Sequence, residues 1–339
     1  MSVDLGRRQR AARRRGVVVT LALAVFALLA VSLMLGQTFY GPGEVFRVIR
    51  GEQVPGASFT VGELRLPRAA LALLAGAALG MAGTTFQTLL RNPLASPDVI
   101  GISSGASVAA VVAIVVLHLG EALVSTLAIL AALATALLIY VLAYVDGVAG
   151  TRLILVGIGI AAMLDSVISY IILRAAMWDL QTAMRWLTGS VNGATWSQVV
   201  PLALAFVVLA PLLVSQGRNL GMLQLGDDAA IALGTRVERT RIIVIVVAVG
   251  LIAFATAAAG PIAFVAFLSG PIAARIVGSG GSSLVLPSAL VGATIVLGAD
   301  LVGQFAFGTR YPVGVVTGAL GAPFLLYLLI RANRSGGSL

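Results

Sequence analysis

Long apolar segments alternate with short polar segments along almost the entire chain. A helix that crosses a membrane needs about 20 mostly apolar residues, because each residue advances 1.5 Å through a hydrocarbon core about 30 Å thick. Ten segments fit this pattern: 17–36, 69–90, 99–117, 122–145, 153–173, 199–215, 242–259, 261–277, 284–301 and 312–330. The pattern therefore predicts an all-α polytopic membrane protein with about ten transmembrane helices.

The chain divides into one transmembrane domain and two short terminal segments. The spans define a domain over 17–331, with a basic segment at 1–16, a loop after the sixth span at about 216–241 and a tail at 332–339. An even number of spans places both termini on one side. If that side is the cytoplasm, fifteen of the 22 arginines lie there and seven lie outside, in keeping with the positive-inside rule. We expect a multi-pass protein of the bacterial cytoplasmic (inner) membrane with cytoplasmic termini.

Composition excludes several functional classes. Charged residues make up 10% of the chain, against roughly a quarter in soluble domains, so membrane lipid is the expected surrounding. The basic residues lie in loops between apolar spans, which does not indicate nucleic-acid binding. All 22 basic residues are arginine, and a chain without lysine has no Walker A lysine to contact nucleotide phosphates. We expect a chain that is not an enzyme and holds no metal or cofactor, so that any ATP hydrolysis, with its ATP and Mg, comes from a partner.

Two kinds of feature within the spans suggest function. Helix-breaking residues occur at 92–97, before the third span, and at Gly260-Pro261 and Gly270-Pro271, which we expect to bracket the eighth. Paired interruptions are typical of transporters built from inverted repeats, here spans two to five and seven to ten. Asp165 and Asp300 are carboxylates inside spans, where an isolated charge is costly enough to indicate function or pairing.

The loop after the sixth span carries the most specific local pattern. Asp227 is a suitable N-cap and Gly234 a suitable C-terminal stop, which predicts a short helix on the cytoplasmic face. A helix of this length is unstable in isolation, so we expect it to dock on a partner. The residues from Asp228 to Gly234 also resemble the coupling signature of ABC-transporter membrane subunits, with Asp228 in place of the usual Glu. The predicted coupling residues are Leu225, Gly226, Asp227, Asp228, Ala229, Ala230 and Gly234.

Several stretches, in the same order along the chain, resemble the FecCD family of ABC importer permeases, which carry ferric siderophores, haem or cobalamin. The matching stretches are 65–68, 87–97, 101–106, 260–265 and 312–323. The resemblance implies the ten-helix fold of type II ABC importer permeases and a dimer with an identical or paralogous permease subunit. It also implies two cytoplasmic ATPase subunits, an extracytoplasmic substrate-binding protein and a ferric-siderophore substrate.

The resemblance also implies roles for individual residues. Arg65 and Arg68 match external arginines that dock the binding protein, a role we favour over interfacial anchoring. A third family arginine falls at Gln304 in this chain, and the nearby Arg310 is the third residue that we expect to dock the binding protein. The expected gate and pathway residues on span five are Gly150, Thr151, Gly157, Ala161 and Asp165. Asp300 matches a family aspartate and is expected to form structural hydrogen bonds.

Two alternatives remain open from the sequence. The same fold could import cobalamin or haem, although 269–271 departs from the Pro-His pattern frequent in relatives and so favours a siderophore. An ion-coupled secondary transporter, with Asp165 or Asp300 carrying protons, would explain the carboxylates. It would not explain the coupling-like loop or the family stretches.

Overall fold

The ten predicted spans each coincide with a helix. The computed structural model describes residues 2–98, 100–144, 150–278 and 283–334, and every regular element in these ranges is helical. Seven helices are long and apolar enough to cross a membrane, and three shorter apolar helices complete the set. The ten are α1 (Ser2–Met34), α4 (Leu66–Leu89), α5 (Ile102–Val111, continued to Val116 by the π-helix η2), α6 (Glu121–Ala143), α7 (Gly150–Arg174), α9 (Trp196–Ser215), α12 (Val237–Ala259), α13 (Val265–Val277), α14 (Val285–Phe305) and α15 (Val313–Arg334).

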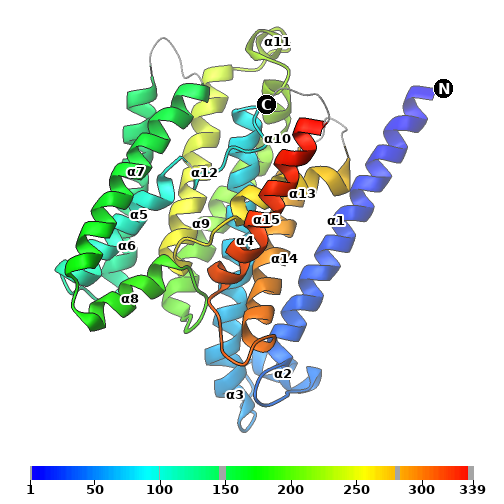
Figure 1. Ribbon diagram of the computed structural model, residues 1–339. Helices are drawn as coiled ribbons and strands as arrows, with labels where there is room; N and C mark the ends of the chain where they lie inside the picture. Colours follow the sequence, from blue (N-terminus) through cyan, green and yellow to red (C-terminus); the bar gives the residue numbers. More distant parts are fainter. Residues whose placement is uncertain (1, 99, 145–149, 279–282, 335–339) are drawn as a thin grey trace.

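Short helices lie at the two ends of this bundle (Figure 1). At one end, called here the α8 end, are α2 (Pro42–Ile49), α3 (Ala57–Phe59), the π-helix η1 (Thr60–Arg65) and α8 (Met177–Leu187). At the other end, the α11 end, are α10 (Gly217–Leu223) and α11 (Asp227–Ala232). The start of α1 and the end of α15 also lie at the α11 end, as an even number of spans requires.

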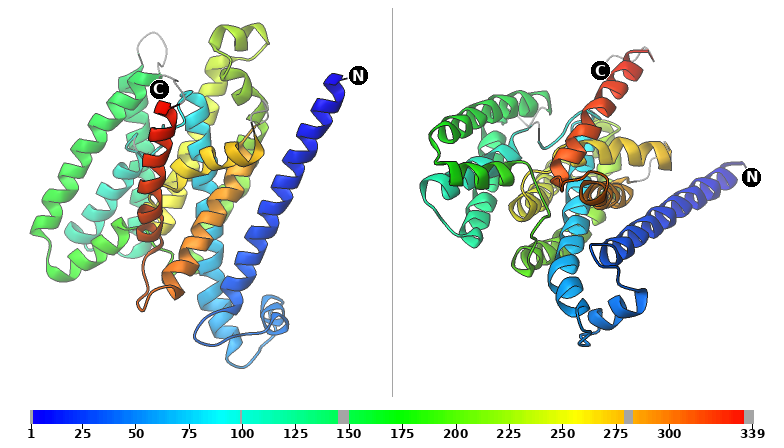
Figure 2. Two further views of the ribbon diagram at one scale, coloured as in Figure 1. Left: turned by 45° about the vertical axis from the view of Figure 1, so that its right-hand side comes forward. Right: turned by 60° about the horizontal axis from the view of Figure 1, so that its bottom comes forward.

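Helix α4 forms the centre of the bundle, with α12, α13 and α14 packed around it (Figure 2). Small residues make the closest of these contacts possible. A Cβ atom on Gly76 would lie 2.5 Å from the carbonyl oxygen of Gly292, so only glycine allows α4 and α14 to approach this closely. Gly80 allows the same close approach, because a Cβ atom there would meet the carbonyl oxygen of Ser288 on α14.

Helix α13 differs from the sequence-based prediction. It begins at Val265 after a break in which Gly260 and Phe264 have φ angles of 71° and 64°. Pro271 lies inside α13 and does not end it. A proline at this position frees the carbonyl oxygen of Phe267, one turn earlier, and the side chain of Gln87 donates to that oxygen at 2.9 Å. The neighbouring helix α4 thus supplies the hydrogen bond that Pro271 removes.

Helix α1 is longer than predicted. The apolar pattern predicted a span over 17–36, whereas α1 begins at Ser2 and carries the basic segment as helix. Its 33 residues extend about 50 Å at 1.5 Å per residue, well beyond a hydrocarbon core of about 30 Å.

Candidate functional site: a coupling helix, a polar cavity and the α8 end

Helix α11 is held in place by a carboxylate shared between two arginines. Gly226, with φ 110°, is the N-cap, so the prediction that Asp227 caps the helix is wrong. Asp227 is the first helical residue, and it accepts from Arg91 at 2.6 Å and from Arg241 at 3.0 Å. These bonds connect α11 to the α4–α5 loop and to α12. Gly234 has φ 83° directly after α11, which confirms the predicted stop.

The two faces of α11 have opposite surroundings. Ala230 is fully buried, with Leu223 and Val237 in the same small apolar cluster. Ile231 and Leu233 are exposed by 60% and 56% on and directly after the helix. Ala230 therefore lies in the interior of the loop, and its predicted role in coupling stays a prediction.

Leu225, Ile231 and Leu233 are three exposed apolar side chains on and directly beside α11, and together they are called here the α11 patch. Only Leu225 was among the predicted coupling residues. The hydrophobicity of Ile231 and Leu233 in a polar loop is the sequence signal that could have identified the other two.

Arg65, one of the two predicted docking arginines, binds within the chain. Its guanidinium donates to the carbonyl oxygens of Leu33, Met34 and Thr38 at 2.9, 2.9 and 2.6 Å. The first two belong to the last turn of α1, whose final carbonyls have no partner within the helix. A cation at a helix C-terminus also complements the helix dipole. Arg65 therefore caps the C-terminal end of α1.

Arg68, the second docking candidate, is paired with Asp300. Its Nε and Nη2 atoms donate to both carboxylate oxygens at 2.7–3.2 Å, and the two side chains are exposed by only 13% and 3%. Gln304, at the position of the third family arginine, donates to the same carboxylate at 2.8 Å. A bidentate pair so well buried joins α4 to α14, and it is not an exposed charge available for docking.

Arg310 differs from the other two arginines. It lies in the loop between α14 and α15 at the α8 end, it is exposed, and no hydrogen bond or ion pair joins it to another described residue. Of the three predicted docking residues, Arg310 alone has a charge that remains free to meet a partner.

The predicted pathway residues of α7 do not share one environment. Gly157 is buried, and a Cβ atom there would lie 2.6 Å from the carbonyl oxygen of Ile100. Ala161 packs on Gly101, at the start of α5. These two positions lie in the contact between α5 and α7, and their predicted role in the gate or pathway stays a prediction. Gly150 and Thr151 begin α7, and Thr151 is exposed.

Asp165, also on α7, lines a cavity of about 570 Å³. The cavity lies between α5, α7 and the 261–264 segment, with Leu325 of α15 at its edge. Within it, Ser103 donates to Asp98 at 2.9 Å. Its remaining lining consists of further serines and of apolar side chains, namely Leu94, Ser96, Ser104, Ser107, Ile168, Ser169, Leu187, Pro261, Ile262, Ala263, Phe264 and Phe267. Two carboxylates among hydroxyl groups and aromatic rings can contact a bulky polar solute without holding it tightly.

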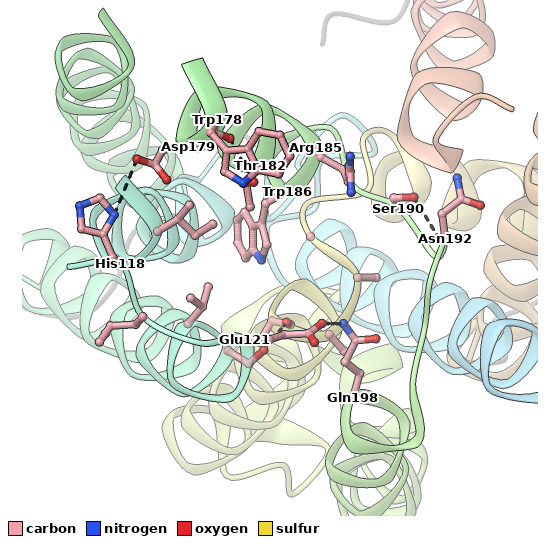
Figure 3. Close-up of a pocket in the computed structure, with 18 residues that line it drawn as sticks. His118, Glu121, Trp178, Asp179, Thr182, Arg185, Trp186, Ser190, Asn192 and Gln198 are labelled. Carbon is pink, nitrogen blue, oxygen red and sulfur yellow. Dashed lines mark hydrogen bonds and ion pairs between the residues drawn. The ribbon is translucent and has the colours of Figure 1, made fainter. Parts of the chain in front are cut away.

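A second cavity, of about 420 Å³, lies beneath α8 (Figure 3). His118 Nδ1 lies 3.7 Å from Asp179 Oδ2, and Gln198 donates to Glu121. These contacts join α8 to the end of η2, and α9 to the start of α6. The α8 residues that line the cavity are Trp178, Asp179, Thr182, Arg185 and Trp186. Neither cavity brings together three metal-ligating side chains within the described ranges.

Comparisons with known proteins relate this architecture to membrane transport. The family model of the FecCD transport family matches residues 23–331. The chain is 40% identical to the ferric enterobactin transport system permease protein of Escherichia coli, over 94% of this chain and 98% of the relative. It is 39% identical to the achromobactin transport system permease protein of Dickeya dadantii, over 93% and 91%.

A more distant relative and a solved structure extend the comparison. The vitamin B12 import system permease protein of Vibrio cholerae is 34% identical, over 97% of each chain. A metal-chelate type ABC transporter, solved in an inward-facing conformation, superposes with a TM-score of 0.83. That structure is 26% identical and covers 94% of this chain and 99% of its own.

Proposed function

This chain belongs to the FecCD transport family, and we propose that it is the permease subunit of an ABC importer for a ferric siderophore. A separate subunit would hydrolyse ATP, bind Mg and drive transport through α11. The α11 end would face the cytoplasm and the α8 end an extracytoplasmic binding protein. The relatives named for enterobactin and achromobactin transport are more similar to this chain than the one named for vitamin B12, which favours a siderophore as cargo.

The α11 patch is the observation that carries this proposal. A helix of six residues, with Leu225, Ile231 and Leu233 turned outward at the polar end of a membrane protein, is expected to be covered by another protein. A secondary transporter has no need of such a surface. Asp300, one of the two carboxylates available to that rival, is already paired with Arg68, so protonating it would break a buried ion pair.

We infer that a second permease subunit completes the site. Helix α7 is a long apolar helix with little of its surface buried, and Leu155, Met163 and Leu173 are exposed by 65%, 55% and 85%. A second permease subunit, identical or paralogous, would cover this face and enclose the cavity that contains Asp165. The cargo would then pass between two copies of α7, with Thr151 near the cytoplasmic end.

Transport itself tests the proposal. In proteoliposomes that contain the permease, its ATPase and its binding protein, we expect uptake of a radioactive ferric siderophore that requires ATP. Thr151→Trp should reduce uptake to background, because an indole would narrow the inner end of α7, whereas Thr151→Ser should transport normally. Both variants should assemble with the ATPase.

Two outcomes would contradict this assignment. Full uptake by Thr151→Trp would place the pathway elsewhere. Uptake that continues without ATP, collapses with the proton gradient and is lost in Asp165→Asn would favour the secondary transporter.

Docking of the binding protein is expected to depend on Arg310. Arg310→Glu should weaken the affinity of the binding protein for the permease about two- to tenfold at low salt, mainly by lowering the association rate. The effect should shrink as salt rises, because charges farther apart than about 8–10 Å are screened at physiological ionic strength. Arg310→Lys, which keeps the charge, is the matched control. Binding-rate measurements that give equal, salt-independent rates for wild type and Arg310→Glu would remove Arg310 from the docking surface.

A further inference from the structure

The start of α1 concentrates positive charge where the helix leaves the membrane. Six of the first fifteen residues are arginine. Because α1 is about 20 Å longer than the hydrocarbon core, we expect its N-terminal part to extend beyond that core. Arg13, Arg14 and Arg15 are the last polar residues before the apolar run that begins at Val17. They therefore lie at the level of the lipid headgroups.

Among the described side chains, no acidic group neutralises Arg13, Arg14 or Arg15. Like charges on one turn of a helix repel one another. Arg13 donates to the carbonyl oxygen of Ile276 at 3.2 Å, and Arg14 donates to that of Ser283 at 3.0 Å. Carbonyl groups orient these side chains but carry no net charge.

The surroundings of α1 indicate which anion is available. The N-terminal half of α1 lies at the edge of the molecule (Figures 1 and 2), where Arg13 and Arg14 reach across to Ile276 and Ser283. Val19, Leu23 and Phe26, which follow the arginines, are exposed by 56%, 62% and 70%. Acyl chains can lie along these side chains while a headgroup meets the arginines. The α11 patch, where an ATPase would dock, is on a different part of the same end.

We propose that Arg13, Arg14 and Arg15, with the carbonyl groups of Ile276 and Ser283 beside them, form a binding site for the phosphate of an anionic phospholipid. Clusters of basic residues directly outside a transmembrane helix are attracted to anionic headgroups. The bonds to Ile276 and Ser283 place two guanidinium groups between α1 and the rest of the bundle. A bound phosphate would compensate their charge and hold α1 against α13 and α14. The site involves no contact with the cargo, so the lipid-binding proposal can be tested separately from the transport function.

The test measures lipid preference on the full-length chain in detergent. The probes are fluorescent phosphatidylglycerol and, as a control lipid without net charge, fluorescent phosphatidylcholine. Wild type should bind phosphatidylglycerol preferentially. In the triple variant R13Q/R14Q/R15Q this preference should fall about tenfold or more, since each arginine near an anionic surface contributes about fivefold. The variant R13K/R14K/R15K should keep most of the preference, because it retains the charge.

A matched triple variant at the opposite end, R47Q/R50Q/R310Q, removes the same net charge and should bind phosphatidylglycerol as wild type does. A preference that survives in R13Q/R14Q/R15Q, or that falls equally in R47Q/R50Q/R310Q, would overturn the proposal. Release of the lipid by millimolar inorganic phosphate at constant ionic strength would also overturn it, because a soluble anion would then fill the site. So would loss of ATPase co-purification in R13Q/R14Q/R15Q with unchanged lipid preference, since the arginines would then contact the ATPase.

Discussion

Replacing Asp300 with alanine is expected to destabilise the folded chain by about 3–5 kcal/mol, because it leaves the Arg68 guanidinium buried without its counter-charge. The pair lies between α4, the central helix of the bundle, and α14, and its two side chains are exposed by only 13% and 3%. Water cannot easily replace the lost carboxylate. Denaturant unfolding of the purified chain in mixed micelles measures the loss.

Two controls separate the effect of losing the charge of Asp300 from the effect of losing its side-chain volume. The double variant Arg68→Met/Asp300→Leu removes both charges and keeps apolar volume, so it should be markedly more stable than Asp300→Ala. Gln304→Ala removes one hydrogen bond to the carboxylate and should cost only about 1–2 kcal/mol. If Asp300→Ala unfolds at the same denaturant concentration as wild type, the pair does not hold α4 to α14.

Ile231→Asp is expected to abolish cargo-stimulated ATP hydrolysis while the permease still folds and inserts. Ile231 is 60% exposed on α11, so its replacement disturbs no packing within the chain. If it enters an apolar cleft of the ATPase, a carboxylate there would lose its water without gaining a partner. A central interface residue of this kind contributes at least about 2 kcal/mol, or roughly 30-fold in affinity. The measurements are co-purification of the ATPase and its stimulation by loaded binding protein.

The control is Phe46→Asp, which places the same charge on a side chain exposed by 54% at the opposite end. It should leave ATPase co-purification unchanged. Ala230→Arg is a poor probe of docking, because Ala230 is fully buried and arginine would disrupt the loop itself. Normal stimulation by a complex that carries Ile231→Asp would falsify the assignment of the α11 patch to coupling.

The coupling loop illustrates how far local sequence reasoning reaches. Its position and its stop at Gly234 were predictable, because a left-handed residue after a short helix favours glycine strongly. The inward orientation of Ala230 was not predictable from the sequence. It depends on an apolar cluster with Val237, which lies beyond the end of α11, and with Leu89, which lies on the distant helix α4. The same limit applies to α7, where small residues at near-helical spacing predicted a pathway face. The structure divides them, with Gly157 and Ala161 against α5 and Asp165 in the cavity.

The sequence by itself determined the ten spans, because the thickness of a bilayer imposes a length and an apolar composition on each helix whatever its neighbours are. It also showed that the printed sequence contains no lysine and therefore no Walker A lysine. Only the tertiary structure decided that Arg68 pairs with Asp300, 232 residues away, and that Gln87 satisfies the carbonyl oxygen freed by Pro271. Such contacts depend on how each helix is rotated and shifted along its neighbours. In lipid, the outward faces of the helices are as apolar as their inward faces, so hydropathy does not show which face of a helix points inward. Close packing and buried polar contacts set that rotation instead.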